Sequence, residues 1–262
     1  MSQNACQEKK TAVITGGAGG LGKAMAIMLA DAGYNIAIVD LNPEQGAKAK
    51  EEVAAHGPCE FFPFNVTHFD EAPALYQKIY DHFGSIDVLC NNAGISPHRG
   101  TTETIEQHHW DLIMDVNLKG PFFMAKAVAP FMEKSGGGSI INTSSVRGYL
   151  ATGDRTLYAI TKWGMQCITA ELATDFWRYG IRVNSFSPGY VLTEMTRAHL
   201  DEPGWLDNQL NIVLIDKMLV PEDIAEVVLF LASDESIAVN GLDIPCEGGT
   251  VVCRGKPCES GV

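Results

Sequence analysis

The stretch TAVITGGAGGLG, residues 11–22, decides the fold class of this 262-residue chain. Residues 11–15 are a short apolar, β-branched run, and residues 21–32 follow with a helical pattern that Gly33 closes. Glycines let the backbone turn tightly and approach a ligand closely, and a helix N-terminus offers free N–H groups to a phosphate. The stretch therefore predicts a strand, a phosphate-binding turn and a helix, as in dinucleotide-binding proteins.

Two spacings of the glycines fit such a turn. Gly17, Gly19 and Gly22 match G-x-G-x-x-G, whereas Gly16, Gly20 and Gly22 match T-G-x-x-x-G-x-G. Both place a glycine at the start of the helix, so the sequence leaves the choice between them open.

Outward from this stretch, strand-like and helix-like segments alternate along the whole chain. Continuous apolar strands that alternate with helices indicate a parallel sheet covered on both faces. We expect an α/β fold in one domain over residues 1–262: a Rossmann-type, doubly wound parallel sheet of about seven strands. The strands are expected at 11–15, 35–40, 60–66, 86–92, 138–145, 181–188 and within 241–249, and the helices at 21–32, 43–55, 70–83, 104–133, 155–179 and 221–232. Ligands of such sheets bind at the carboxyl ends of the strands.

Two prolines modify this expectation. Pro63 lies inside the third strand, which indicates an edge strand or a bend because proline cannot donate a ladder hydrogen bond. Gly120–Pro121 indicates a bend in the helix at 104–133.

The composition disfavours several classes of partner and site. The net charge of −13 disfavours nucleic acid and anionic membranes as partners. Seven scattered cysteines with no C-x-x-C pair, and a polar start of the chain, favour a reducing, cytoplasmic location. No apolar run approaches the roughly 20 residues of a membrane span. His108 and His109 are neighbours on a helix and point about 100° apart, so we expect no metal site there.

Asp40 ends the second strand, 24 residues after Gly16. A carboxylate there would bind the adenosine ribose hydroxyls and repel a 2′-phosphate, which favours NAD over NADP. No Lys or Arg lies in the glycine turn or directly after Asp40. The alternative is that Asp40 caps the following helix.

Tyr158 and Lys162 lie four residues apart on a predicted helix. They share one helix face, offset by about 40° and roughly 6 Å along the axis. Such a pair is either a surface pair or a proton donor whose pKa is lowered by a neighbouring cation.

Over nearly its whole length the chain resembles a short-chain dehydrogenase/reductase. The segments that carry the resemblance are TGGAGGLG (15–22), NNAG (91–94), VNLKGPF (116–122), INTSS (141–145), YAITK (158–162), SPGYVLT (187–193) and CEGG (246–249). Their order and spacing together are far more specific than any one of them.

The resemblance implies a catalytic set of Asn117, Ser145, Tyr158 and Lys162. Tyr158 would be the general acid/base, its pKa lowered by Lys162 and by the nicotinamide charge. Ser145 lies 13 residues before Tyr158 and would polarise the substrate oxygen, with Ser144 the adjacent structural candidate. Asn117 would hold a water that links Lys162 to solvent.

The resemblance also implies the residues that bind the cofactor, NAD. They are Gly16, Gly20, Leu21, Gly22, Asp40, Asn65, Val66, Asn92, Ala93, Gly94, Tyr158, Lys162, Pro188, Gly189, Val191 and Thr193. Asn91 and Gly94 would line the ribose and the centre of the sheet, and Thr193 would bind the carboxamide or a phosphate. Asn65 replaces an aspartate that the family often uses to read the adenine amine, and its carbonyl oxygen remains a possible acceptor.

We expect a small-molecule substrate, and three arginines lie in the segments expected around its pocket: Arg99, Arg147 and Arg155. They could hold a carboxylate, sulfonate or phosphate. The alternative is that they pair with acids such as Asp154 or with a neighbouring subunit. Residues 190–218 are expected to contain a substrate lid, with Trp205 as an apolar wall.

The sequence favours an NAD-dependent alcohol dehydrogenase or ketone reductase acting on a small polar, anionic alcohol. Three alternatives stay open: a neutral polyol or sugar as the substrate, a non-catalytic NAD-binding redox sensor, and an epimerase or dehydratase on the same fold. The family usually forms tetramers, so we expect a homotetramer, or else a dimer, that buries Phe122, Phe123, Trp163 and Phe176. The polar tail 254–262 has no assigned role.

Overall fold

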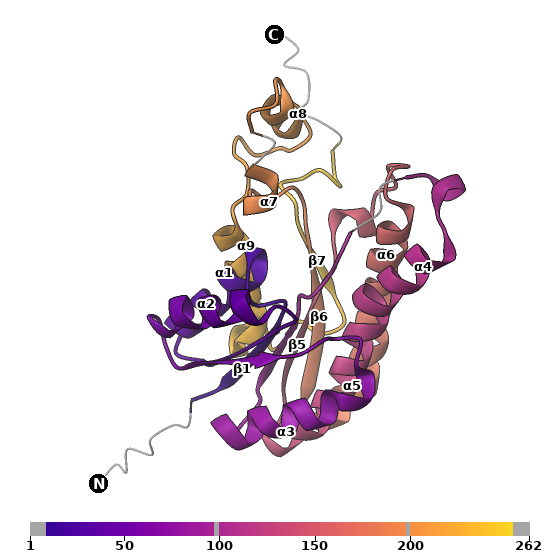
Figure 1. Ribbon diagram of the computed structural model, residues 1–262. Coiled ribbons are helices and arrows are strands. Elements are labelled where there is room, and N and C mark those ends of the chain that lie inside the picture. The colour runs from indigo at the N-terminus through magenta and orange to yellow at the C-terminus, as the bar shows by residue number, and fades with distance from the viewer. Residues whose placement is uncertain (1–8, 97–99, 198–199, 254–262) are drawn as a thin grey trace.

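A computed structural model describes residues 9–96, 100–197 and 200–253. Its centre is a seven-stranded sheet in which every strand is parallel to its neighbours (Figure 1). The strands are β1 (Thr11–Thr15), β2 (Asn35–Asp40), β3 (Cys59–Pro63), β4 (Val88–Asn91), β5 (Gly138–Thr143), β6 (Ile181–Pro188) and β7 (Asp243–Cys246). Their order is β3-β2-β1-β4-β5-β6-β7, so the direction of winding reverses between β1 and β4. Ligands of doubly wound sheets bind beside this reversal.

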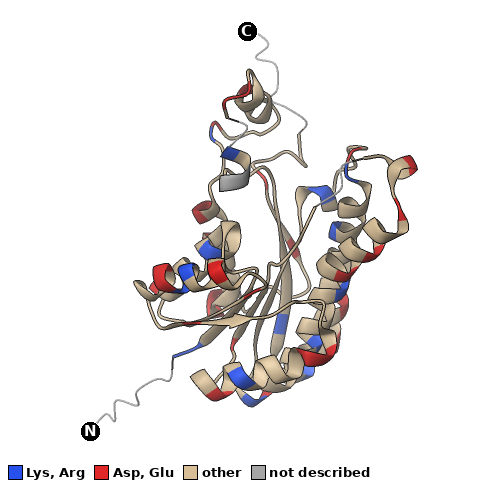
Figure 2. Ribbon diagram, viewed as in Figure 1, with Lys and Arg blue, Asp and Glu red and all other residues tan. Residues whose placement is uncertain are grey.

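Helices cover both faces of the sheet (Figure 1). One layer holds α1 (Gly20–Asp31), α2 (Pro43–Ala54) and α9 (Pro221–Ala232), and the other holds α3 (Ala72–Phe83), α5 (Gly120–Lys134) and α6 (Thr156–Phe176). The predicted fold class is confirmed, and most predicted elements lie within a few residues of their observed bounds. Figure 2 shows acidic and basic residues interspersed over the helices of both layers.

The two apolar layers meet at the central strands. Val13 packs into the cluster formed with α3, α5 and α6, whereas its neighbour Ile14 packs into the cluster formed with α1 and α9, and both side chains are fully buried. Successive strand residues point to opposite faces, so a strand buried on both sides must be apolar throughout. This is why residues 11–15 do not alternate between apolar and polar side chains.

The third strand confirms what Pro63 predicted. β3 lies at one edge of the sheet, and Pro63 is its last residue. The main chain of Pro63 has no N–H to donate, and an edge position is where that loss is tolerated.

The helix predicted at 104–133 is not continuous. α4 (Gln107–Met114) passes into a π-helical turn, Asp115–Lys119, before α5 begins, and there the Gly120 N–H donates to the Asp115 carbonyl, five residues back. Pro121 explains the break, because it has no N–H for the Asn117 carbonyl and its ring would clash with it. The irregular turn therefore lies just before the predicted bend, and it contains the buried Asn117.

The segment 190–218 leaves the body of the protein and returns to it. Its two ends meet where Val191 bridges to Leu219 and the Leu192 N–H donates to the Leu219 carbonyl oxygen at 2.8 Å. Between them, α7 (Glu194–Arg197) and α8 (Trp205–Asn211) project above the carboxyl ends of the strands (Figure 1).

Of the aromatic residues predicted to be buried between subunits, Phe176 belongs to the protein's own core and is 9% exposed. Trp163, on α6, is 53% exposed, and Phe122, on α5, is 36% exposed. In the described part of the chain, no helix combines the length and the apolar character needed to cross a membrane.

Candidate active site

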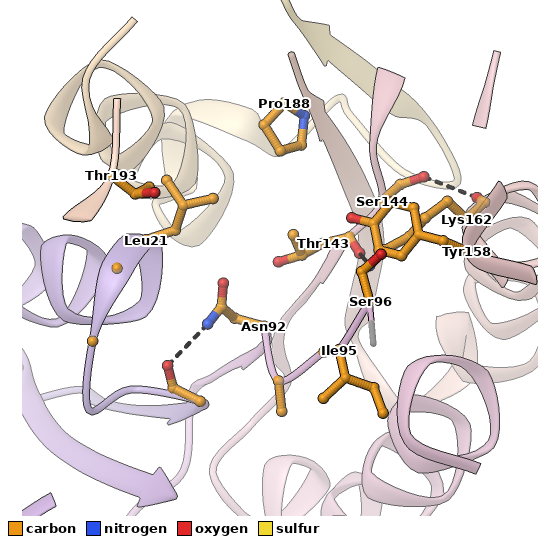
Figure 3. Close-up of a pocket in the computed structure, with 15 residues that line it drawn as sticks. Leu21, Asn92, Ile95, Ser96, Thr143, Ser144, Tyr158, Lys162, Pro188 and Thr193 are labelled. Carbon is orange, nitrogen blue, oxygen red and sulfur yellow. Dashed lines mark hydrogen bonds between the residues drawn. The ribbon is translucent and has the colours of Figure 1, made fainter. Parts of the chain in front are cut away.

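A cleft of about 480 Å³ opens at the carboxyl ends of the central strands, at the reversal of the strand order (Figure 3). Four parts of the chain wall it: the glycine turn after β1, the segment after β4, the end of β5 with α6, and the end of β6. The lining residues are Gly16, Gly19, Gly20, Leu21, Asn92, Ala93, Gly94, Ile95, Ser96, Thr143, Ser144, Tyr158, Lys162, Pro188 and Thr193.

The glycine turn has a backbone that other residues would disturb. Gly16 and Gly20 adopt φ angles of 63° and 52°, in the left-handed region that favours glycine. A Cβ on Gly16 would lie 2.9 Å from the Ala93 Cα, and one on Gly22 would collide with the Gly16 carbonyl oxygen. A Cβ on Gly17 would also lie close to backbone, 2.9 Å from the Ile14 carbonyl oxygen, but neither Gly17 nor Gly19 has a positive φ. The structure thus favours the spacing Gly16, Gly20, Gly22.

The N-terminus of α1 fits the pyrophosphate of a dinucleotide. Its N-cap residue is Gly19, which lines the cleft and supplies no capping side chain, and no acidic residue lies in the first turn. The first N–H groups of a helix have no partner within it, and the helix dipole favours an anion beside them. The glycine turn and this helix end together form a cradle for phosphate.

Asp40 braces the glycine turn rather than capping a helix. Its Oδ2 accepts a 3.1 Å hydrogen bond from the Ala18 N–H, and its Oδ1 accepts one from the Asn42 N–H at 3.2 Å. Asn42 is the residue that caps α2, since its Oδ1 accepts from the N–H groups of Glu44 and Gln45. The alternative reading of Asp40 as the helix cap is therefore wrong.

The two asparagines of NNAG have different positions. Asn92 lines the cleft, and its Nδ2 donates to the main-chain carbonyls of Thr15 and Gly16 at 3.2 and 3.0 Å. Asn91 is buried and donates to the Pro121 carbonyl and to Asn142 Oδ1. The expectation that Asn91 lines the ribose site is therefore corrected: it ties the centre of the sheet together, and Asn92 faces the cleft.

Other residues predicted to bind the cofactor lie outside the lining of this cleft. The Oδ1 of Asn65 already accepts from the N–H and the hydroxyl of Thr67, at 3.0 and 2.9 Å. Val66 and Val191 are buried, and Gly189 packs against Glu247. Because the Asn65 oxygen is engaged in this local turn, its expected role as a free acceptor for adenine is not supported.

Tyr158 and Lys162 point into the cleft from one face of α6 (Figure 3). The Lys162 Nζ lies 5.4 Å from the centre of the Tyr158 ring and donates a 2.6 Å hydrogen bond to the Thr143 carbonyl oxygen. Lys162 is only 4% exposed, so the surface-pair reading is excluded.

Burial opposes the charged form of both groups. It lowers the pKa of Lys162 to about 8. It raises the pKa of Tyr158, and the hydrogen bond with Ser145 and the charges of Arg155 and Arg147 offset that only in part. The expected lowering of the Tyr158 pKa by Lys162 is therefore wrong for the protein's own groups, because desolvation of the phenolate is the larger effect.

The adjacent serines divide two tasks. Ser144 is buried, and its hydroxyl donates to the Lys162 carbonyl oxygen at 2.9 Å, which fixes α6 to the end of β5. Ser145 starts the 3₁₀ turn Val146–Gly148, where its Oγ accepts from the Arg147 N–H at 3.2 Å, and it also hydrogen-bonds the Tyr158 side chain. The structure thus places Ser145, the residue chosen by spacing, beside the phenol.

Asn117 fixes the segment that follows NNAG. Its Oδ1 accepts from the Ile95 N–H and its Nδ2 donates to the Ile95 carbonyl, both at 2.8 Å. Its side chain is thereby committed to positioning Ile95, which lines the cleft.

The arginines predicted around the substrate differ in their contacts. Arg147 donates to Asp154 at 3.3 Å, the ion pair that was the alternative reading, and to the Tyr190 hydroxyl at 3.4 Å. Arg155 donates a 2.6 Å hydrogen bond to the hydroxyl of Ser96, which lines the cleft. Arg99 lies outside the described residues. Trp205 begins α8 and is not among the residues that line the cleft.

Two further residues of the site carried no sequence signal of their own. Ser96 was missed although it follows NNAG by two residues, and Tyr149, just after the Ser145 turn, hydrogen-bonds Asp243 at 2.6 Å. Within the described ranges, no group of three or more His, Cys, Asp or Glu side chains is arranged to hold a metal ion.

The fold and the cleft define an α/β dinucleotide-binding protein, and the comparisons with known proteins agree. A family model described as Enoyl-(Acyl carrier protein) reductase matches residues 16–251. The chain belongs to the short-chain dehydrogenase/reductase family of oxidoreductases.

Named relatives have different activities. The chain is 35% identical to a 3-oxoacyl-(acyl carrier protein) reductase FabG of Thermotoga maritima, over 94% of this chain and 99% of the relative. It is 36% identical to a trans-4-hydroxycyclohexanecarboxylate dehydrogenase of Sinomonas cyclohexanicum, over 92% of each chain. A solved short-chain type dehydrogenase/reductase from Mycobacterium ulcerans superposes with a TM-score of 0.90 at 27% identity, covering 95% of this chain and 92% of that one.

Proposed function

We propose that this oxidoreductase transfers a hydride between NAD and a small polar secondary alcohol, or the corresponding ketone or aldehyde, and that the substrate carries an acidic group. The observation that carries the proposal is that Tyr158 and Lys162, with Ser145 beside the phenol, face a cleft that also holds a phosphate cradle. Arg155 is hydrogen-bonded to Ser96 in the lining of this cleft.

The residues of the cleft fit a nicotinamide dinucleotide. The cradle of Gly16, Gly20 and the α1 N-terminus would hold the pyrophosphate. Asp40, at the end of β2, would face the adenosine ribose, and its carboxylate disfavours the 2′-phosphate of NADP. Pro188 and Thr193 line the opposite side of the cleft, where the nicotinamide would lie. NAD is therefore the cofactor that we propose.

The protein's own groups account for the proton transfer. When bound, the nicotinamide supplies or accepts the hydride. Tyr158 donates a proton to the substrate oxygen during reduction and takes it back during oxidation. Ser145 donates a hydrogen bond to the same oxygen and stabilises the charge that develops on it. Lys162 is held beside the ring of Tyr158, where its ammonium is placed to bind the nicotinamide ribose. The positive charge of the nicotinamide would oppose the desolvation that raises the Tyr158 pKa.

Arg155 supports an anionic substrate. Its guanidinium donates a hydrogen bond to Ser96, which lines the cleft. Among the described residues, Arg155 forms no ion pair within 4.0 Å, whereas Arg147 is paired with Asp154. An arginine beside a polar cleft on a chain of net charge −13 is suited to bind a carboxylate, sulfonate or phosphate. The Sinomonas relative is named for a hydroxy carboxylate substrate, which is chemistry of the same kind.

One observation favours a second candidate, a neutral polyol or sugar. The ion pair between Arg147 and Asp154 neutralises part of the positive charge at the rim. The Asp154 carboxylate, 52% exposed, would then accept hydrogen bonds from substrate hydroxyls.

We also propose that the enzyme acts in the cytoplasm as a homotetramer, or else as a dimer, without nucleic acid or membrane as partners. Trp163 and Phe122 expose large apolar surfaces on neighbouring helices, which supports burial against a second copy. The five described cysteines are free thiols, which fits a reducing compartment.

A substrate panel tests the proposal. Small hydroxy acids, sulfonated and phosphorylated alcohols, polyols and sugars are offered with NAD or NADP, and NADH or NADPH formation is followed by absorbance. We expect turnover with NAD and a secondary alcohol that bears an acidic group. Turnover only with neutral polyols or sugars would replace the substrate proposal by the second candidate. Binding of NAD without turnover of any alcohol would favour a redox sensor instead.

A further inference from the structure

A carboxylate next to the proposed active site has partners that the catalytic set does not explain. Asp243, the first residue of β7, accepts hydrogen bonds from the hydroxyls of Tyr149, Ser185 and Ser187 at 2.6, 2.5 and 2.7 Å. Gln166 Nε2 adds a longer contact of 3.5 Å. Within the ranges that the structure describes, no Lys, Arg or His lies within ion-pair distance of this carboxylate.

The sequence of β6 explains why a carboxylate is needed there. Ser185 and Ser187 are two residues apart in the strand, so their side chains point to the same face, and both residues are fully buried. Buried hydroxyls require partners. Asp243 pairs with Ser185 in the strand register and supplies an acceptor to both serines. Charge-assisted bonds of this kind are stronger than bonds between neutral groups.

The same carboxylate contacts three parts of the chain beside the cleft: the turn after β5, α6 and the end of β6. Tyr149 directly follows the turn that Ser145 begins. Gln166 lies one helical turn beyond Lys162 on α6. Ser187 immediately precedes Pro188, which lines the cleft.

The hydrogen bond from Tyr149 to Asp243 should be maintained over a wide range of pH. Burial and the nearby Asp243 carboxylate raise the pKa of Tyr149 well above its ordinary value. Its phenol therefore stays protonated, and remains a donor, over the pH range in which the enzyme would work. Fully satisfied buried networks of this type are rigid.

We infer that Asp243 is a positioning residue, which holds the Ser145 turn through Tyr149 and the nicotinamide side of the cleft through Ser187. The inference rests on the proposed function for its catalytic consequence, but the tether itself exists whatever the substrate. Loss of the Tyr149 bond should free the turn and misplace Ser145, and loss of the Ser187 bond should loosen Pro188 and weaken cofactor binding.

Hydrogen exchange and kinetics on single variants test this inference. In Tyr149→Phe, amide exchange in residues 144–150 should become roughly 10-fold faster or more, while residues 181–188 keep their wild-type rates. With the best alcohol of the panel, kcat should fall by roughly 10-fold or more while the Kd for NADH stays unchanged. In Ser187→Ala, the Kd for NADH should rise by roughly 10-fold.

Ser185→Ala is the matched control, because it removes a hydrogen bond to the same carboxylate from the middle of a strand that is paired on both sides. It should lower stability without changing exchange in 144–150 or the Kd for NADH. Asp243→Asn should combine both effects, and the single hydroxyl variants decide the question if it does not fold.

Two results would overturn the inference: wild-type exchange in 144–150 of Tyr149→Phe, or the same changes in Ser185→Ala as in the other two variants. A wild-type enzyme that turns over no alcohol would instead refute the proposed function. The exchange pattern and the Kd for NADH still decide the tether in that case.

Discussion

The Lys162 ammonium nitrogen lies 5.4 Å from the centre of the Tyr158 ring, and its hydrogen bond to the Thr143 carbonyl holds it there. The two residues come from successive turns of α6, and the tie to β5 fixes the helix against the sheet. Burial moves their pKa values apart, because it lowers that of Lys162 to about 8 and raises that of Tyr158 above its ordinary value. Desolvation therefore favours the neutral form of both side chains, and such strongly perturbed groups in a cleft are typical of functional sites.

Replacing Tyr158 by Phe should lower kcat at least ~10²-fold, because a positioned general acid/base contributes about that much or more. NADH binding should persist, since the hydroxyl alone is removed. Steady-state kinetics and a fluorescence titration with NADH measure the two effects. Tyr179→Phe, at the far end of α6, serves as the control and should leave both unchanged. Wild-type turnover by Tyr158→Phe would refute the assignment.

Replacing Lys162 by Met should abolish most activity without destabilising the protein at pH 7. The folded pKa of about 8 lies below the unfolded value of 10.5, so the cost of burying the charge is fully present below pH 8. Removing the buried charge should therefore stabilise the variant by about 3 kcal/mol. The variant also loses the hydrogen bond to the Thr143 carbonyl, which contributes roughly 1–3 kcal/mol, so the two effects largely cancel.

The difference in stability between the wild type and Lys162→Met should depend on pH. In the wild type, the burial cost is relieved as pH rises from 8 towards 10.5, so any stability advantage of Lys162→Met should shrink over that range. Urea denaturation of both proteins at pH 7 and pH 9.5, at one protein concentration, measures the difference. A variant that is several kcal/mol less stable than wild type at both pH values would contradict the argument.

The central strands were predictable because each is a short, largely apolar run that is buried on both faces, and the parallel sheet followed from them. Local chemistry indicated the edge position of Pro63, whereas the choice of Ser145 came from the family resemblance and its spacing from Tyr158. The engaged oxygen of Asn65 was not foreseen, because whether a side chain caps its own turn depends on the backbone angles there. The bond between Tyr149 and Asp243 joins residues 94 positions apart, and no local pattern encodes such a contact.

Asp40 should give the enzyme a preference for NAD over NADP. Asp40→Asn removes the negative charge yet keeps an oxygen that can accept from the Ala18 N–H, so the glycine turn stays braced. We expect the ratio of kcat/KM for NAD to that for NADP to fall by roughly 10-fold or more, about 1.4 kcal/mol. Glu44→Gln, an exposed change of equal charge two residues after the Asn42 cap, is the control. Equal kcat/KM values for the two cofactors in the wild type would show that Asp40 does not discriminate between them.

Assembly should depend on the exposed aromatic residues of α5 and α6. We expect sedimentation velocity at micromolar concentration to show a tetramer or a dimer. Trp163→Glu should shift it towards monomer, because Trp163 is 53% exposed and a charge in a buried apolar interface is costly. Trp177→Glu, at a site 71% exposed beyond the end of α6, is the control. A wild-type monomer would contradict the proposed assembly.

Arg155 is the residue at which the proposal of an anionic substrate is tested most directly. A hydrogen bond to a charged group contributes about 1.5–3 kcal/mol, so Arg155→Met should lower kcat/KM for an anionic alcohol by roughly 10- to 150-fold. It should change kcat/KM for a neutral analogue by far less. Arg147→Met should have a smaller effect, since Arg147 is already paired with Asp154, and Arg178→Met, in the 3₁₀ turn after α6, should have none. The proposal fails if Arg155→Met lowers turnover of anionic and neutral substrates equally, because such a loss would place Arg155 in support of Ser96 and α6 rather than in contact with the substrate.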